Sequence, residues 1–393
     1  MEDRRRVSTA RLCAISCVPV LAVTVFLTCV ARASARPASS QELKTWLVRG
    51  SEALEKGDNA SAEAAFRRAL KIDPHSVEVL NDLAIALARQ GKIEEAVPVY
   101  ERALKVRPRD PKTTRNLAIA YFRAQRCQDA WPLLQSLTRA RDPDFQTLEL
   151  AGLTLFALDR YPEAAEYLER ASHTKPSDLP ALYMLGKAYL RSKNYQAVTR
   201  VFSRIVSINP NSPEAHTMMG TAYDKMFQEE DALREYKAAE KANPDFPGVH
   251  SGLGQIYWKQ GHLERAQAEF KKELRRFPND PVSNCLLAQI LLRQGHPAEA
   301  AIHFQSAITA NARYKEAFFG LGQAKLKLGD PAAAVATLRK AVKLDPDYAQ
   351  AHFVLGAALR QLGRSQEAAR EQRISSEIQA RQQAKYTQKL NSQ

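Results

Sequence analysis

The most constraining feature of this 393-residue sequence is a period of 34 residues. Seven of nine positions spaced by 34 residues are proline, namely Pro74, Pro108, Pro176, Pro210, Pro244, Pro278 and Pro346, with Asp142 and Ala312 as the exceptions. Because the chain has 20 prolines, chance would place only about half a proline at nine positions. A period that runs this far without insertion predicts stacked structural repeats, not two or three separate globular domains.

Other positions recur with the same period. With the proline as position 32, the repeats start near residues 43, 77, 111, 145, 179, 213, 247, 281, 315 and 349. Position 8 is always Gly or Ala, position 20 is Ala in nine of ten repeats, and position 24 is often aromatic, as at Phe66, Phe202 and Phe270. Apolar residues at positions 7, 11 and 27 complete helical stripes. The small residues predict two helices that cross closely in every repeat.

Helix boundaries are also marked in the sequence. Position 34 offers N-caps at Ser76, Asp110, Asp144, Asp178, Ser212 and Asp280, and a proline suited to the first helical turn follows at Pro111, Pro213, Pro247 and Pro281. Position 15 is Gly in six repeats and supplies a turn between helices, but Gly is absent there in repeats three to six. Each repeat therefore predicts an antiparallel pair of helices.

These residues resemble the tetratricopeptide repeat family. The family pattern has Trp at position 4, Leu at 7, Gly at 8, Tyr at 11, Ala at 20, Phe at 24, Ala at 27 and Pro at 32. It is met nearly whole by Trp46, Gly50, Ala62, Phe66, Ala69 and Pro74. The resemblance covers residues 43–375. It implies an all-α fold, a right-handed α-solenoid of about ten 34-residue helix-turn-helix repeats with a C-terminal capping helix. We expect that cap and a polar tail over residues 364–393, overlapping the last repeat.

The N-terminus reads as a targeting segment. Four arginines precede an uncharged, mostly apolar stretch from Leu12 to Val30, which Ala33, Ser34 and Ala35 follow in an A-x-A pattern. Residues 1–35 thus predict a signal peptide or an N-terminal membrane anchor, because the apolar stretch is long for the first and short for the second. Residues 36–42 would be a short linker. The expected location is outside the cytoplasm: periplasmic, secreted, or anchored by this segment.

Composition gives weaker constraints on function. The net charge is +14, of which residues 36–393 carry +11, and the basic residues are spread along the chain instead of forming one run. Such a charge would attract acidic partners. Only Cys127 and Cys285 lie outside the targeting segment, so no disulfide framework or zinc set is predicted.

The resemblance places a binding groove on helix A, at positions 2, 5, 9, 12 and 13, which packing leaves free. Position 13 forms a basic ladder of Arg89, Arg123, Arg191, Lys225, Lys259, Arg293 and Lys327. It could hold acidic segments, although such residues could also only solvate the groove. Apolar anchors are expected at Phe122, Phe156 and Trp258 of position 12 and at Tyr183 of position 5, if they are not packed between helices.

Position 9 adds a third set of groove residues. Gln255, Gln289 and Gln323 occupy it in three successive repeats. A side-chain amide offers both a donor and acceptors and can pair with the backbone of an extended peptide. Chance and solvation are the alternative explanations.

No catalytic constellation is found. His216, His250 and His352 all fall at position 4, where a packing side chain is expected, and their repeats hold them too far apart to share one metal ion. Gly252 and Gly254 lie inside a predicted helix without a preceding strand, so they do not form a dinucleotide fingerprint. We expect no enzyme activity, no cofactor and no metal.

The sequence predicts a non-enzymatic scaffold that binds an extended peptide or a partner protein in the groove, and the net charge favours acidic partners. One alternative is the recruiting subunit of a separate enzyme or envelope complex. Another is an adaptor for polyanions, although nucleic acid is not the favoured partner. Membrane contact is expected only through the N-terminal segment.

Overall fold

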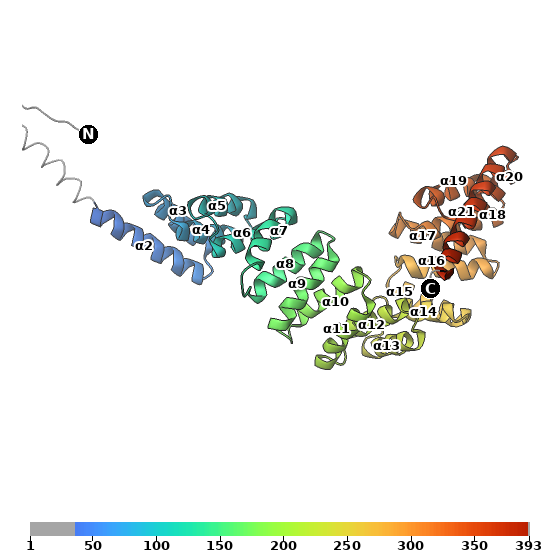
Figure 1. The fold of residues 1–393 in the computed structure, drawn as a ribbon, viewed down its shortest axis with the longest axis horizontal. Helices are drawn as coiled ribbons and strands as arrows, with labels where there is room; N and C mark the ends of the chain where they lie inside the picture. The colour runs from blue at the N-terminus through green and yellow to red at the C-terminus, as the bar shows by residue number, and fades with distance from the viewer. Residues whose placement is uncertain (1–35, 392–393) are drawn as a thin grey trace, which may run out of the picture. The chain divides into compact units, whose positions relative to one another are not determined.

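The computed structural model describes residues 36–391, and within that range every regular element is an α-helix. The targeting segment predicted at residues 1–35 lies outside the described residues. The described chain divides into two compact units, with the boundary after Leu158. Consecutive helices inside each unit pack side by side as antiparallel neighbours (Figure 1).

The first unit contains the helices of the first three repeats and helix A of the fourth. They are α2 (Arg36–Glu55), α3 (Asn59–Ile72), α4 (Val77–Arg89), α5 (Ile93–Val106), α6 (Pro111–Arg123), α7 (Cys127–Thr138) and α8 (Phe145–Ala157). Residues 36–42, which the sequence analysis assigns to a short linker, are the first turns of α2.

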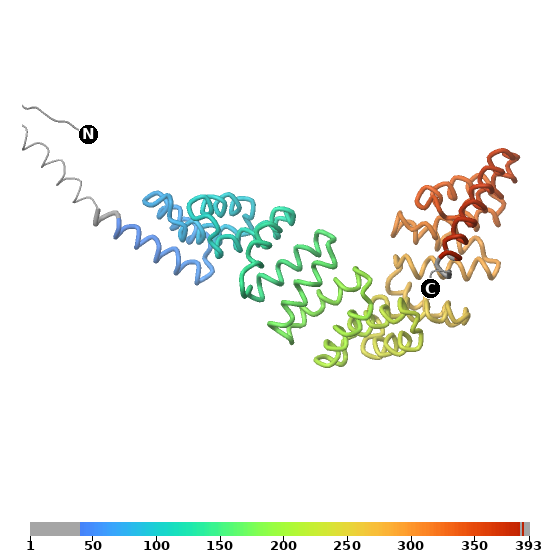
Figure 2. The backbone as a smooth tube through the Cα atoms, viewed as in Figure 1, coloured from blue at the N-terminus to red at the C-terminus, as the bar shows by residue number. Residues whose placement is uncertain are grey.

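The second unit begins with helix B of the fourth repeat. Its helices are α9 (Tyr161–Thr174), α10 (Leu179–Arg191), α11 (Tyr195–Ile208), α12 (Pro213–Lys225), α13 (Glu229–Ala242), α14 (Val249–Lys259), α15 (Leu263–Arg276), α16 (Pro281–Arg293), α17 (Pro297–Ala310), α18 (Lys315–Lys327), α19 (Pro331–Leu344), α20 (Ala349–Gln361) and α21 (Ser365–Asn391). The even-numbered helices are helix A of each repeat. The backbone tube of Figure 2 follows this alternation.

The N-caps predicted at position 34 are present. In each of the six cases the side chain accepts a hydrogen bond from the backbone N–H three residues later, as Asp110 does from Thr113 and Asp178 does from Ala181. An N-cap of this kind contributes about 1 kcal/mol. The local sequence therefore determines where most A helices begin.

Repeat seven departs from this rule. Pro247 was expected as the first helical residue, but α14 begins two residues later because Gly248 adopts a left-handed φ of 86°. Glu273 of α15 replaces the missing cap, since its buried carboxylate accepts hydrogen bonds from the N–H groups of Gly248 at 2.8 Å and Ser251 at 3.1 Å. Burial raises the pKa of Glu273, and these two hydrogen bonds oppose the shift.

The turn between helices is the same whether or not it contains Gly. The six position 15 glycines have left-handed φ angles, and so do the residues that replace them in repeats three to six, Gln125, Asp159, Lys193 and Phe227. A non-glycine residue in this region is strained by about 1–2 kcal/mol. Helix packing on both sides of the turn therefore imposes the conformation.

The core is a row of large side chains held between small residues. Phe270 of helix B is fully buried, and a Cβ atom added to Gly254 of helix A would stand 2.5 Å from its ring. Gly186, at position 8 of repeat five, faces Phe202 in the same way. This close approach explains why position 8 accepts only Gly or Ala.

The described array ends in a long helix. Helix α21 packs on α20, and Ala368 and Ile378 are its buried apolar residues, while most of its later residues are exposed. No helix in residues 36–391 combines the length and apolar character that a bilayer crossing requires.

Candidate peptide-binding groove

Two residues of the basic ladder bind backbone carbonyls. Arg89 donates from Nη1 to the carbonyl of Leu54, and Lys327 donates from Nζ to the carbonyl of Leu292, each at 3.1 Å. Both acceptors lie at position 12 of the preceding repeat, in the last turn of its helix A. A cation there pairs with carbonyls that the helix leaves unsatisfied. These two side chains link neighbouring repeats.

Three more ladder residues have side-chain partners. Asp224, buried at position 12, lies 2.6 Å from Nζ of Lys259 and 3.5 Å from Nζ of Lys225. Arg191 donates to the hydroxyl of Tyr161 at 2.8 Å and stacks over its ring. The basic character of the ladder is thus largely used within the protein.

Arg123 and Arg293 differ from the rest of the ladder. Both are exposed, and neither has a hydrogen bond or ion pair within residues 36–391. Arg123 lines a small pocket of the first unit, about 160 Å³ in volume, together with Arg89. Arg123 and Arg293 are therefore the ladder residues best able to bind the carboxylate of a ligand.

The predicted apolar anchors are all half-buried or engaged. Phe122, Phe156 and Trp258 are half-buried. The hydroxyl of Tyr183 hydrogen-bonds with Ser212 Oγ at 2.5 Å, and its ring meets Phe202 edge-on at 5.9 Å. Tyr183 of α10 therefore contacts α11 and the residue that caps α12, and it is not a free anchor.

The three glutamines at position 9 differ in whether their amides are hydrogen-bonded within the protein. Gln255 donates within its own helix to the carbonyl of Ser251 at 3.3 Å, and Gln289 has only a long contact of 3.8 Å with Cys285 Sγ. Gln323 makes no hydrogen bond with the described part of the chain. The amides of Gln289 and Gln323 are thus available to a ligand.

Five of the fourteen predicted groove residues meet in one open pocket of about 490 Å³ in the second unit. These five are Trp258, Gln289, Arg293, Gln323 and Lys327. The pocket is completed by Leu292, Phe319, Gly320, Tyr348 and Gln350, so that α14, α16, α18 and the start of α20 all contribute. The other nine predicted residues lie outside it.

Aromatic rings form much of the pocket wall. Phe319 and Tyr348 pack together with ring centroids 5.1 Å apart. The indole N–H of Trp258 is buried and has no hydrogen-bond partner among residues 36–391. Burial raises the pKa of Tyr348 to about 12, so its hydroxyl stays protonated at neutral pH. The pocket therefore combines apolar surface with hydrogen-bond donors.

Two pocket residues were missed by the sequence analysis. Tyr348 falls at position 34, where most repeats carry Ser or Asp as the N-cap, and Gln350 falls at position 2. The loss of a capping residue at position 34 was the available signal for Tyr348. Gln350 lies at a position expected to face the groove, but nothing else in the sequence distinguished it from the residues at position 2 of the other repeats.

The histidines at position 4 are buried and paired with glutamates. Nδ1 of His216 lies 2.8 Å from Glu235, and Nδ1 of His352 lies 2.6 Å from Glu371. In both pairs Nε2 also hydrogen-bonds to the carbonyl of the position 32 proline, Pro210 at 3.0 Å and Pro346 at 3.1 Å. These histidines fill the packing role expected of position 4.

Models of the tetratricopeptide repeat match most of the described chain. One matches residues 47–112, 81–145, 115–178, 285–324 and 319–373, and others match residues 155–221, 228–261 and 248–280. A search of curated proteins found no match.

Several solved structures are similar in fold. YrrB, described as a TPR protein with an unusual peptide-binding site, is 20% identical with a TM-score of 0.40, over 46% of this chain and 92% of its own. MamA from Desulfovibrio magneticus RS-1 is 23% identical with a TM-score of 0.40, over 43% and 96%. Yeast Tom70 is 13% identical with a TM-score of 0.38, over 86% and 92%. At these identities the likeness concerns the fold alone.

Proposed function

We propose that this chain, which belongs to the tetratricopeptide repeat family, binds an extended peptide segment of a partner protein in the groove formed by its A helices. Members of this family are typically non-catalytic scaffolds that bind proteins or peptides. The observation that supports this most is the pocket between α14 and α20, where aromatic rings, free amides and an unpaired guanidinium converge.

The pocket matches the chemistry of an extended peptide backbone. Gln289 and Gln323 lie one repeat apart and each offers a donor and an acceptor to successive peptide groups. The amide groups of Gln289 and Gln323 have no strong hydrogen bond inside the described chain, so both can pair with a peptide. Binding is thus favoured by hydrogen bonds that the free protein leaves unmade.

Side chains of the peptide would find two kinds of contact. The rings of Phe319 and Tyr348 suit an apolar or aromatic side chain. Arg293 is the pocket cation without a partner, whereas Lys327 is already held by the carbonyl of Leu292. We therefore propose an acidic side chain or a terminal carboxylate beside an apolar residue as the preferred peptide motif.

The alternatives are less well supported. A polyanion adaptor needs a row of free cations, but five of the seven ladder residues have partners inside the protein. A recruiting subunit of a separate enzyme or envelope complex would use the same groove and differ only in the identity of the partner.

The proposed location is outside the cytoplasm. It rests on the arginines and apolar stretch of residues 1–35, with the chain either released after Ala35 or retained as an anchor. Mass spectrometry of the mature N-terminus from fractionated cells tests it. A start at Arg36 in an exported fraction indicates a free protein, an intact leader in membranes indicates an anchored one, and an intact leader in the cytosol contradicts export.

Peptide binding is tested by selecting binders to the full chain from a random peptide display library and measuring their affinities by fluorescence anisotropy. We expect selected peptides to pair an acidic with an apolar residue. Arg293→Met and Gln323→Ala should each weaken binding by about tenfold, the equivalent of about 1.4 kcal/mol. The matched control is Arg123→Met in the first unit. Selected peptides that bind all three variants like the natural protein would contradict the proposal.

A further inference from the structure

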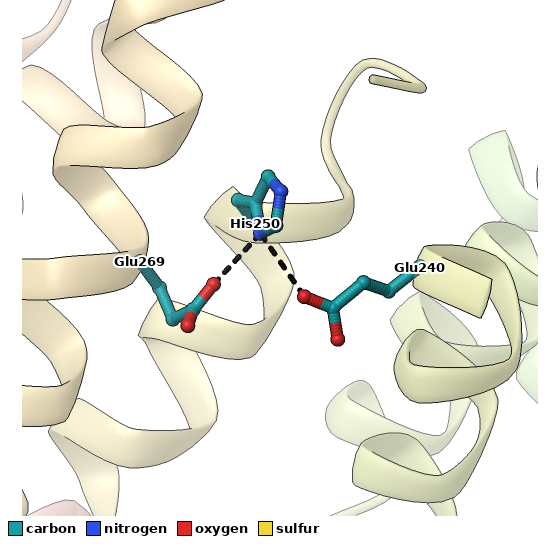
Figure 3. Close-up of side chains that lie close together, drawn as sticks. All are labelled: Glu240, His250 and Glu269. Carbon is teal, nitrogen blue, oxygen red and sulfur yellow. Dashed lines mark hydrogen bonds and ion pairs between the residues drawn. The ribbon is translucent and has the colours of Figure 1, made fainter. Parts of the chain in front are cut away.

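The contacts of His250 differ from those of the two other histidines at position 4. Its Nδ1 lies 2.7 Å from Oε2 of Glu269, as in the His216 and His352 pairs, but also 3.9 Å from Oε1 of Glu240. Figure 3 shows the two carboxylates approaching the imidazole from either side. Two acids thus converge on one imidazole nitrogen only in this repeat.

The equivalent residues of other repeats show whether Glu240 is needed for the His–Glu pair. Glu240 occupies position 28 of the preceding repeat, and the equivalent residues before His216 and His352 are Val206 and Val342. A valine there suffices for the packing of a His–Glu pair. Glu240 is therefore not needed to build the pair at His250.

The other nitrogen of His250 is also different. In the two other pairs Nε2 hydrogen-bonds to the position 32 carbonyl, but Nε2 of His250 has no hydrogen-bond partner within residues 36–391. The late start of α14 at Val249, after the left-handed Gly248, accompanies this difference. The imidazole is thus held only through the nitrogen that faces the two acids.

A cation already lies beside these acids. Nζ of Lys272 is 2.8 Å from Glu269 and 3.7 Å from Glu240. Two carboxylates so close to each other repel unless a positive charge lies between them. A cation thus already neutralises both carboxylates, and a metal ion bound to them would compete with the ammonium group of Lys272.

We propose that Glu240, His250 and Glu269 form a Zn²⁺ site that joins helices α13, α14 and α15. Their three ligand atoms lie within 4.8 Å of one another. One imidazole with two carboxylates suits Zn²⁺, which commonly keeps water as a fourth ligand. His250 and Glu269 are largely buried, whereas about a third of the Glu240 side chain is exposed and leaves a path from solvent.

In this site the neutral imidazole binds through the Nδ1 lone pair and keeps its proton on Nε2. Both glutamates bind as carboxylates, and Lys272 moves into solvent as an ammonium ion. The site departs from the expectation that the chain binds no metal. That expectation rested on the distance between histidines of different repeats, whereas Glu240, His250 and Glu269 lie together where repeats six and seven meet.

The test is Zn²⁺ binding by the full chain, measured by competition with a chromophoric chelator and by the shift in melting temperature. We expect one Zn²⁺ per chain and no comparable effect of Mg²⁺, which prefers an all-oxygen, hydrated environment. Co²⁺ should give the visible absorption of a four-coordinate site.

Three variants locate the metal. Glu240→Val, which installs the residue of the equivalent repeats, should weaken Zn²⁺ binding by at least about tenfold while leaving the fold intact. Lys272→Met should strengthen binding, because it removes the competing cation. His216→Asn should leave binding unchanged, and asparagine already occupies position 4 at Asn284. Absence of Zn²⁺ binding by the natural chain, or equal binding by Glu240→Val, would overturn the proposal. Binding by Lys272→Met alone would also overturn it for the natural chain.

Discussion

The junction of repeats six and seven and the junction of repeats eight and nine have the same groove positions but different surfaces. At the first, Lys225 and Lys259 are both engaged by the buried carboxylate of Asp224. At the second, the residue equivalent to Asp224 is Leu292, which leaves Arg293 unpaired and lines an open pocket. The residue at position 12 thus decides whether the adjacent cation at position 13 pairs with a carboxylate, as Lys225 does, or stays unpaired, as Arg293 does.

The largest effect should come from breaking the first junction. Lys259→Met leaves the buried carboxylate of Asp224 with only its longer contact to Lys225, and should destabilise the protein by about 2 kcal/mol. Chemical denaturation measures this change. An unchanged unfolding midpoint would show that Asp224 is satisfied without Lys259.

A transplant between the junctions should have the next largest effect. Leu292→Asp gives the second junction the carboxylate of the first, where Nζ of Lys327 already lies 3.1 Å from the carbonyl of residue 292. Loss of a buried leucine, partly offset by the new ion pair, should cost about 1–2 kcal/mol. Acidic peptides should no longer bind, as anisotropy can measure. Retained binding of acidic peptides would show that Arg293 does not select for charge.

The turns offer a smaller, stabilising change. Phe227 in repeat six is 87% exposed and has a φ of 61°, whereas repeat nine has Gly329 at the same place. Phe227→Gly should stabilise the protein by about 0.5–1 kcal/mol, since relief of strain exceeds the added entropy of the unfolded chain. Thermal unfolding compares it with Gly329→Ala, which should destabilise. Destabilisation by both would indicate that the Phe227 ring contributes contacts of its own.

The smallest effect should come from the free cation. Arg293→Met removes no hydrogen bond or ion pair within the described chain and should change stability by less than about 0.5 kcal/mol, although we expect it to weaken peptide binding. Chemical denaturation compares the free energy of unfolding of this variant with that of Lys259→Met. Equal losses of stability in the two would contradict the division of the ladder into structural and free residues.

Much of the fold could be predicted because its signals are local. The caps at Asp110 and Asp178 act three residues away, and the glycine of the turn acts at its own position. The start of α14 could not be predicted, because the cap of that helix comes from Glu273 on another helix. For the same reason, the sequence could not show that Tyr183 is engaged by Ser212, the residue that caps helix A of the next repeat.

The sequence by itself determined the repeat, the helix pairs and the positions that could face a ligand, because each follows from short-range patterns of packing, capping and turn chemistry. Only the tertiary structure decided which of those positions are available. A basic residue at position 13 looks the same in each repeat that carries one, but its partner is a carboxylate, a hydroxyl, a carbonyl or solvent according to what the neighbouring helix places beside it. Those partners lie about one repeat away in sequence, and only helix stacking brings them within the reach of a hydrogen bond.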